Sequence, residues 1–261
     1  MSRQNYYKHR RVRQRRQIDE QLVVSLVCQE RAVQPRLGGR KLLHILQAEI
    51  LSAGVLIGRD RFFELLRSNE LLIERKVRSV RTTWSNHGLR TYVNLLKDFE
   101  LTAPHQVLVS DITYIRTDEG FLYLCLVMDA FSRAIVGFDC SDTLEVEGAM
   151  RALSEALCQL PSGVQVIHHS DRGSQYCCGD YVQLLKDAEA RISMTEENHC
   201  YENSQAERLN GILKQEYGLG ERFIRKSDAK AAVRESVMLY NWRRPHQALG
   251  YALPMQVHTA A

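Results

Sequence analysis

The sequence predicts an α/β domain with a mixed five-stranded sheet, preceded by a small all-α region. Two patterns and one count lead to this prediction. Apolar residues recur at helical spacing between residues 17 and 70, whereas β-rich runs begin at Gln106 and then alternate with helical stretches. Charge divides in the same way: residues 1–90 carry 19 Lys/Arg and 8 Asp/Glu, and residues 91–261 carry 16 and 23. A basic helical region therefore precedes a larger domain rich in carboxylates.

Composition excludes several classes of protein. The chain has 261 residues, of which 44% are hydrophobic and 25% charged, which is typical of a folded domain and not of a disordered tail. The longest apolar run, 121–128, is far shorter than the roughly 18 residues of a membrane span. No apolar segment follows the basic start, so we expect a cytoplasmic protein. The seven cysteines include no C-x-x-C pair, which favours reduced, structural thiols.

The N-terminal region, 1–74, is expected to be a basic, helical, helix-turn-helix-like DNA-binding region. Residues 1–16 form a basic arm, and apolar spacing predicts helices at 17–31, 40–51 and 59–70. The last two surround a Gly-bearing turn, and the final helix offers Arg59, Arg61 and Arg67 as candidate DNA contacts. Many helical hairpins that bind no DNA share this outline, and a solvated charged surface is the alternative reading.

A linker is expected at 75–104, followed by a domain at 105–261. Three β-rich runs with short links predict an antiparallel meander, at 106–115, 121–131 and 133–140. A helix, a strand, a helix and a strand follow, at 144–160, 164–171, 179–190 and 191–195, and the chain is helical again from 203. This is the element order of a ribonuclease H-like core with helices covering a mixed sheet.

Three acids stand where such a sheet can bring them together. Asp111 lies inside a Val/Ile-rich strand, where a carboxylate is costly unless it is paired or binds a metal. Asp171 ends the fourth strand, and Glu207 lies on a helix beside its apolar face. Such oxygen ligands suit Mg²⁺ or Mn²⁺, and two ions about 3.5–4 Å apart would support phosphodiester chemistry. A hydrogen-bonded structural Asp111, a turn Asp171 and a solvated Glu207 are the alternatives.

Other candidate residues have less support from the sequence. Lys214 follows Glu207 along the same helix and can reach a DNA phosphate or remain solvated, while Arg243 and Arg244 can contact phosphates or brace the core. A zinc site made of His168, His169, Cys177 and Cys178 is disfavoured, because neighbouring pairs cannot easily share one tetrahedral ion. We expect His168 to pack on the sheet.

The sequence segments around these acids resemble the second-reading-frame transposases of the bacterial IS-three insertion-sequence family. The matches run in order along the chain: QVLVSDITYI, YLCLVMDAFSRAIVGF, HSDRGSQY, SMTEENHCYENSQAERLNGILKQE and YNWRRPHQALGYALP. SRQNYYK, GGRKLLHILQ and LIGRDRFFELLR near the start are similar to that family's N-terminal extension. This sequence departs from the family pattern at four positions. It has Leu108 where Trp is usual, His105 in place of Asn, Glu202 in place of Asp, and Arg208 in place of Ser. Asn203 can cap the helix that carries Glu207.

The resemblance implies an integrase-like catalytic core of the DDE type that nicks DNA at element ends and joins the freed 3′-OH to another phosphodiester. It implies that Asp111, Asp171 and Glu207 are the metal-binding catalytic triad. It also implies double-stranded DNA as substrate, both as element end and as target, a homo-oligomer on DNA, and a companion first-frame protein. A DNA-binding regulator or inactive remnant, and a metal-dependent nuclease without strand transfer, are the alternative functions.

Overall fold

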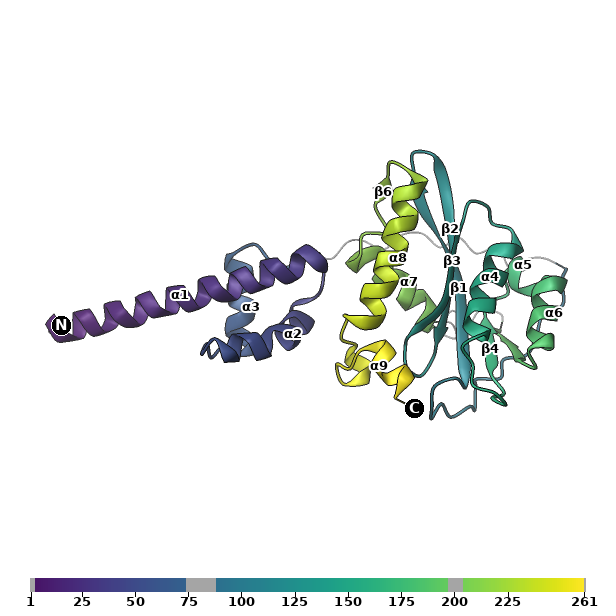
Figure 1. The fold of residues 1–261 in the computed structure, drawn as a ribbon, viewed down its shortest axis with the longest axis horizontal. Coiled ribbons are helices and arrows are strands. Elements are labelled where there is room, and N and C mark those ends of the chain that lie inside the picture. Colours follow the sequence, from purple (N-terminus) through teal and green to yellow (C-terminus); the bar gives the residue numbers. More distant parts are fainter. Residues whose placement is uncertain (1–2, 74–87, 197–203, 261) are drawn as a thin grey trace. The chain divides into compact units, whose positions relative to one another are not determined.

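The computed structural model describes residues 3–73, 88–196 and 204–260. The chain divides into two compact units, Met1–Val77 and Arg78–Ala261 (Figure 1). Each unit has a hydrophobic core of its own. None of the described helices combines the length and hydropathy needed to cross a membrane.

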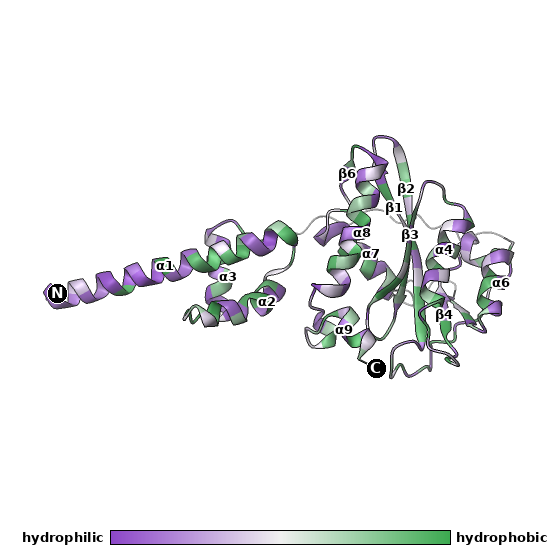
Figure 2. Cartoon of the chain, in the orientation of Figure 1, coloured by the Kyte–Doolittle hydropathy of each residue, from purple (hydrophilic) through white to green (hydrophobic). Residues whose placement is uncertain are grey.

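The N-terminal unit contains three helices, α1 (Arg3–Val33), α2 (Gly39–Ser52) and α3 (Arg59–Ser68), which contact one another. Its core is apolar and includes Val27, Leu42 and Phe62. The predicted arm is not separate from the first helix, because α1 begins at Arg3 and residues 3–18 of it are exposed. The beginning of α1 is mostly hydrophilic (Figure 2). Only the later turns of α1 face the core, where Val23 and Val27 are buried.

The second unit is built on a sheet whose main path has the order β3-β2-β1-β4-β5. Its strands are β1 (Val107–Thr117), β2 (Gly120–Asp129), β3 (Ile135–Ser141), β4 (Ile167–Ser170) and β5 (Arg191–Met194). The first three pair antiparallel, as the meander predicted, and β4 runs parallel to both β1 and β5. A sixth strand, β6 (Arg222–Phe223), extends the five-strand prediction by pairing with the end of β1. Two residues are too few for a sequence pattern to reveal a strand.

Helices cover both faces of this sheet. Figure 1 shows α4, α5 and α6 on one side and α7, α8 and α9 on the other. Their bounds are Val146–Leu157, Ser174–Cys177, Gly179–Asp187, Ser204–Glu216, Lys226–Trp242 and Pro254–Thr259, and a 3₁₀ turn, η1, spans Gln247–Leu249. Because both faces are covered, β2 is apolar almost continuously: Leu124 and Leu126 belong to one core cluster, Cys125 and Val127 to the other.

Small residues let α4 lie close to the sheet. A Cβ on Gly137 of β3 would come within 2.0 Å of the Ala152 carbonyl oxygen, so glycine is required there. Ala149, Ala152 and Ala156 line the facing side of α4. This close approach fixes the helix against β3.

The predicted linker is only partly described, and the described part belongs to the second unit. Leu95 and Leu96 pack against a core cluster of the sheet, and the Leu95 backbone N–H donates to Ser193 Oγ at 2.9 Å. Residues 74–87 lie outside the described residues. The limits of 74 and 105 for the two domains therefore stay a prediction.

Candidate active site

Asp111 lies in the middle of the sheet, on β1, and is partly buried. Its Oδ2 accepts a hydrogen bond of 2.7 Å from the side-chain amide of Asn210 on α7. Its Oδ1 accepts one of 2.9 Å from the backbone N–H of Ile112. The predicted strand position is confirmed, and the carboxylate is held by donors from its own strand and from α7.

Asp171 follows the last residue of β4. Val109 of β1 pairs with His169 across the parallel strands, two residues before each acid, and the charge of Asp171 raises the pKa of Asp111. Asp171 Oδ1 accepts a hydrogen bond of 2.9 Å from the Gly173 backbone N–H. A Cβ on Gly173 would lie 3.0 Å from that oxygen, so the small residue keeps the carboxylate accessible. Asp171 therefore organises a turn just beyond β4 and acts electrostatically on Asp111.

The three acids interact electrostatically. Burial first, and then the negative charges of Asp171 and Glu207, raise the pKa of Asp111 to about 7 against the opposing effect of the Asn210 and Ile112 hydrogen bonds. Glu207 is exposed on the first turn of α7. The site thus brings the charges of three carboxylates to bear on one another, a condition that favours a cation.

Lys214 lies on the same helix, near the acids. Its Nζ is 4.6 Å from the centre of the Tyr114 ring, a cation–π contact. Burial lowers the pKa of Lys214, and Tyr114 and Asp111 act in the opposite direction. The field of Asp111 therefore reaches this ammonium group, which lies at the border of the site.

The acids fit a hard divalent cation by their chemistry. They offer carboxylate oxygens, which Mg²⁺ and Mn²⁺ prefer, and their mutual repulsion is relieved by positive charge. Among the described residues, however, the three carboxylates do not form a group whose ligand atoms all lie within 4.8 Å of one another. The donor set suits the ion, and the side chains have to draw closer to share one.

The candidate DNA-contacting arginines fall into two kinds. Arg61 is engaged, because it pairs with Glu20 of α1 and, at 2.6 Å, with Glu64. Arg59 pairs with Asp60 and stays exposed, as does Arg67 in the last turn of α3.

The two C-terminal arginines differ in the same way. Arg243 is exposed. The Arg244 side chain is 3% exposed and donates to both carboxylate oxygens of Glu216, at 2.7 and 2.9 Å. Arg244 therefore braces Glu216 of α7 from the residue after the end of α8 and its C-cap.

His168 packs on the sheet, as expected. Its Nε2 lies 2.8 Å from Ser110 Oγ and 3.0 Å from the Tyr181 hydroxyl, and burial lowers its pKa to about 3. The imidazole is therefore neutral and structural. His168, His169, Cys177 and Cys178 do not form a metal-ligand group among the described residues.

Asn210 was not among the predicted site residues. It is buried, and its amide oxygen has no hydrogen-bond partner among the described groups. The signal was present in the sequence, because Asn210 lies three positions after Glu207 and thus one turn along the same helix face. The expected cap Asn203 and the variant position Glu202 lie outside the described residues.

Similarity to known proteins agrees with this geometry. Two family models described as integrase core domain match residues 102–200 and 188–254. An uncharacterized 31 kDa protein of insertion element IS600 from Shigella sonnei is 36% identical over 242 residues, covering 92% of this chain and 88% of the relative. The InsF transposase of insertion sequence IS3A from Escherichia coli K12 is 42% identical over 173 residues, 65% of this chain and 60% of InsF. The chain belongs to the IS3 transposase family. It is a transposase with a DDE-type integrase core, an enzyme of the polynucleotidyl transferase class that acts in DNA transposition.

A solved structure supports the fold of this IS3-family chain. The cryo-EM structure of a simian T-cell lymphotropic virus intasome, in complex with the PP2A regulatory subunit B56 gamma, has a chain that matches with a TM-score of 0.52 at 18% identity. The match covers 82% of this chain and 71% of that one. The integrase-like, ribonuclease H-like architecture predicted from the element order is therefore confirmed.

Proposed function

We propose that this chain cleaves DNA at the ends of a bacterial insertion sequence and joins the freed 3′-OH to target DNA, with Asp111, Asp171 and Glu207 as the catalytic carboxylates. The observation that carries the proposal is that Asp111 on β1 and Asp171, directly after the parallel strand β4, interact electrostatically in an integrase core. The unfavourable field at Asp111 supports it, because structural acids are ordinarily provided with compensating partners.

In this proposal the three carboxylates bind two Mg²⁺ or Mn²⁺ ions. When bound, such ions activate the attacking oxygen and stabilise the leaving one. The chain itself orients the carboxylates: Asn210 holds Asp111 from α7, and the Gly173 backbone N–H holds Asp171. Lys214, fixed over the Tyr114 ring, is placed to contact a DNA phosphate beside the acids. No Ser-His-Asp set is required.

The partners follow from the family and from charge. We propose double-stranded element ends and target DNA as substrates, bound in part by the exposed basic turns of α1 and by Arg59, Arg67 and Arg243. Two element ends must be joined in one event, so we propose a homo-oligomer on DNA, and a first-frame companion that contributes end recognition. The bacterial cytoplasm, where the DNA lies, is the proposed place of action.

The test is a cleavage and strand-transfer assay on a labelled element-end duplex with Mg²⁺ or Mn²⁺. Asp111→Asn, Asp171→Asn and Glu207→Gln are expected to lower product formation by more than about 1,000-fold, since each removes a ligand of a charge-stabilising site. DNA affinity, measured by electrophoretic mobility shift, should change little. The exposed Asp98→Asn is the matched control and should retain activity.

Each alternative gives a different result. Metal-dependent nicking without joined products favours a nuclease. DNA binding with no chemistry in the wild-type chain, with or without a companion protein, supports a regulator or inactive remnant. Full activity in any of the three carboxylate variants would contradict the assignment of that residue.

A further inference from the structure

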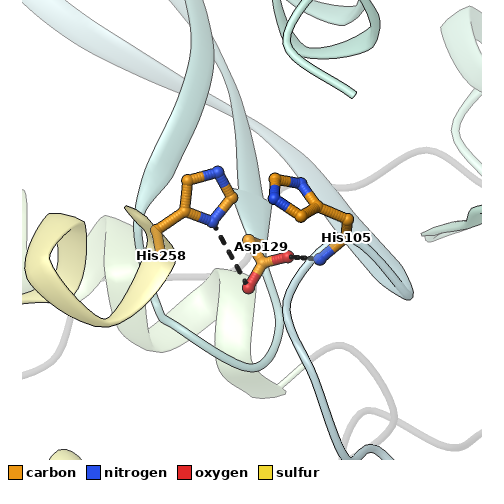
Figure 3. Close-up of side chains that lie close together, drawn as sticks. All are labelled: His105, Asp129 and His258. Carbon is orange, nitrogen blue, oxygen red and sulfur yellow. Dashed lines mark hydrogen bonds and ion pairs between the residues drawn. The ribbon is translucent and has the colours of Figure 1, made fainter. Parts of the chain in front are cut away.

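Two histidines and a buried aspartate meet at the end of β2, and the proposed function gives none of them a role. Figure 3 shows the rings of His105 and His258 beside the carboxylate of Asp129. One ligand atom of each residue lies within 4.8 Å of the others, and this is the group with metal-ligand spacing among the described residues. The three come from separate segments: the chain before β1, the end of β2, and α9.

Asp129 is held firmly in place. It has no exposed surface, and its Oδ1 accepts hydrogen bonds of 2.7 Å from both the backbone N–H and the hydroxyl of Ser132. Its Oδ2 accepts one of 2.7 Å from the His105 backbone N–H. Hydrogen bonds of this kind orient a metal-binding carboxylate from its outer side. Burial lowers the pKa of the nearby Arg133 guanidinium, and the charges of Tyr240 and Asp129 partly oppose that change.

The two imidazoles are close enough to bind one ion. Their ring centres lie 4.4 Å apart, and His258 Nδ1 is 3.9 Å from Asp129 Oδ1. Ligand atoms on a tetrahedral ion, each about 2.0–2.1 Å from the metal, are separated by about 3.3 Å. The donors therefore need to approach by less than about 1.5 Å. His105 is half-buried, whereas Asp129 and His258 are buried.

The backbone at His105 has a conformation that few residue types adopt. Its φ of 66° lies in the left-handed region, which Asn adopts more readily than His. The backbone N–H of any residue there could serve Asp129, so the turn itself does not require an imidazole. Histidine is one of the residue types that adopt this conformation, and here its ring lies beside that of His258.

We propose that His105, Asp129 and His258 bind a divalent transition-metal ion of the zinc type, which ties helix α9 to the beginning of β1 and to the turn after β2. Two imidazole nitrogens and one carboxylate oxygen form a donor set typical of Zn²⁺ and unlike the all-oxygen set around Asp111. The ion has a structural role, because it holds these three segments together. The site is independent of the proposed catalytic function.

The test is Zn²⁺ binding by the full, untagged chain after treatment with a chelator, followed by calorimetry and thermal unfolding. These measurements use a background variant that carries Asp111→Asn, Cys28→Ser and Cys158→Ser. The three substitutions remove one carboxylate of the candidate active site and two exposed thiols, which could compete for Zn²⁺. In this background His105→Asn keeps the backbone donor and suits the left-handed conformation, so the variant is expected to fold. His258→Gln is the second variant.

We expect one Zn²⁺ per chain and a rise in unfolding temperature. We expect His105→Asn to weaken binding by more than the roughly 10–100-fold that loss of an outer-sphere partner costs, with its metal-free unfolding temperature unchanged or higher. Co²⁺ in place of Zn²⁺ should give the visible absorption of a tetrahedral site, lost in both variants. No binding, or binding that His105→Asn and His258→Gln leave intact, would overturn the proposal and leave a hydrogen-bonded cluster only.

Discussion

The exposed start of α1 and the interior of the integrase core hold charged side chains in opposite environments. Over residues 3–18 of α1, side chains are exposed, and basic residues follow one another along a single helix. In the core, the Arg244 side chain is 3% exposed and bonded to Glu216, and Asp111 is held by Asn210. An enclosed charge depends on one particular partner, whereas an exposed row acts through its summed field, which salt screens.

The largest expected effect comes from breaking an enclosed pair. Arg244→Leu leaves the Glu216 carboxylate without its cation, so we expect the free energy of unfolding to fall by about 3 kcal/mol in urea denaturation. The matched control is Arg234→Leu at an exposed position of α8, for which a change within about 0.5 kcal/mol is expected. Equal losses in both variants would mean that enclosure does not distinguish the two arginines.

The pH dependence of stability tests the enclosed carboxylate. Because the folded pKa of Asp111 is raised to about 7, the folded state holds its proton more tightly than the unfolded state does. Without divalent metal, wild-type stability should therefore fall relative to Asp111→Asn as the pH rises from about 4 to about 7.5. Denaturation with a chelator present measures this difference, and parallel curves for the two proteins would contradict the raised pKa.

The exposed row should show its effect in DNA affinity. Replacing Arg10, Arg11, Arg13 and Arg15 together by Gln is expected to weaken duplex binding by about 30-fold, roughly 2 kcal/mol, at low salt. The slope of log affinity against log salt should fall as well. Arg61→Gln serves as the comparison, since Arg61 is already paired with Glu20 and Glu64 and should matter less. An unchanged salt slope in the quadruple variant would remove α1 from the DNA-binding surface.

The smallest expected effect concerns Asn210. Asn210→Ala removes the hydrogen bond to Asp111 Oδ2, worth about 1 kcal/mol, so we expect cleavage to slow by about fivefold. The concentration of Mg²⁺ at half-maximal activity should rise, with DNA affinity unchanged, because Asn210 acts through a carboxylate and not on the DNA. Asn210→Asp adds a negative charge to the cluster and should lower activity further. Wild-type metal dependence in Asn210→Ala would show that Asp111 needs no support from α7.

Sequence patterns alone predicted most of the architecture. Alternating and continuous apolar runs placed the meander, and helical spacing placed α2, α3 and the packing side of α7. These predictions succeed because burying one face of a strand or helix leaves a period in the chain. The position of Asp111 inside β1 and of Asp171 after β4 could be read in the same way.

Tertiary structure decided what depends on partners distant in the chain. No local pattern shows that Arg244 closes on Glu216, that β6 pairs with β1, or that Asn210 donates to Asp111. His105 and His258 come together only because the sheet brings the chain before β1 against α9. Sequence periodicity records which face of an element is buried, and only the folded chain determines which polar groups meet there, since each meeting depends on register, helix placement and backbone conformation at once.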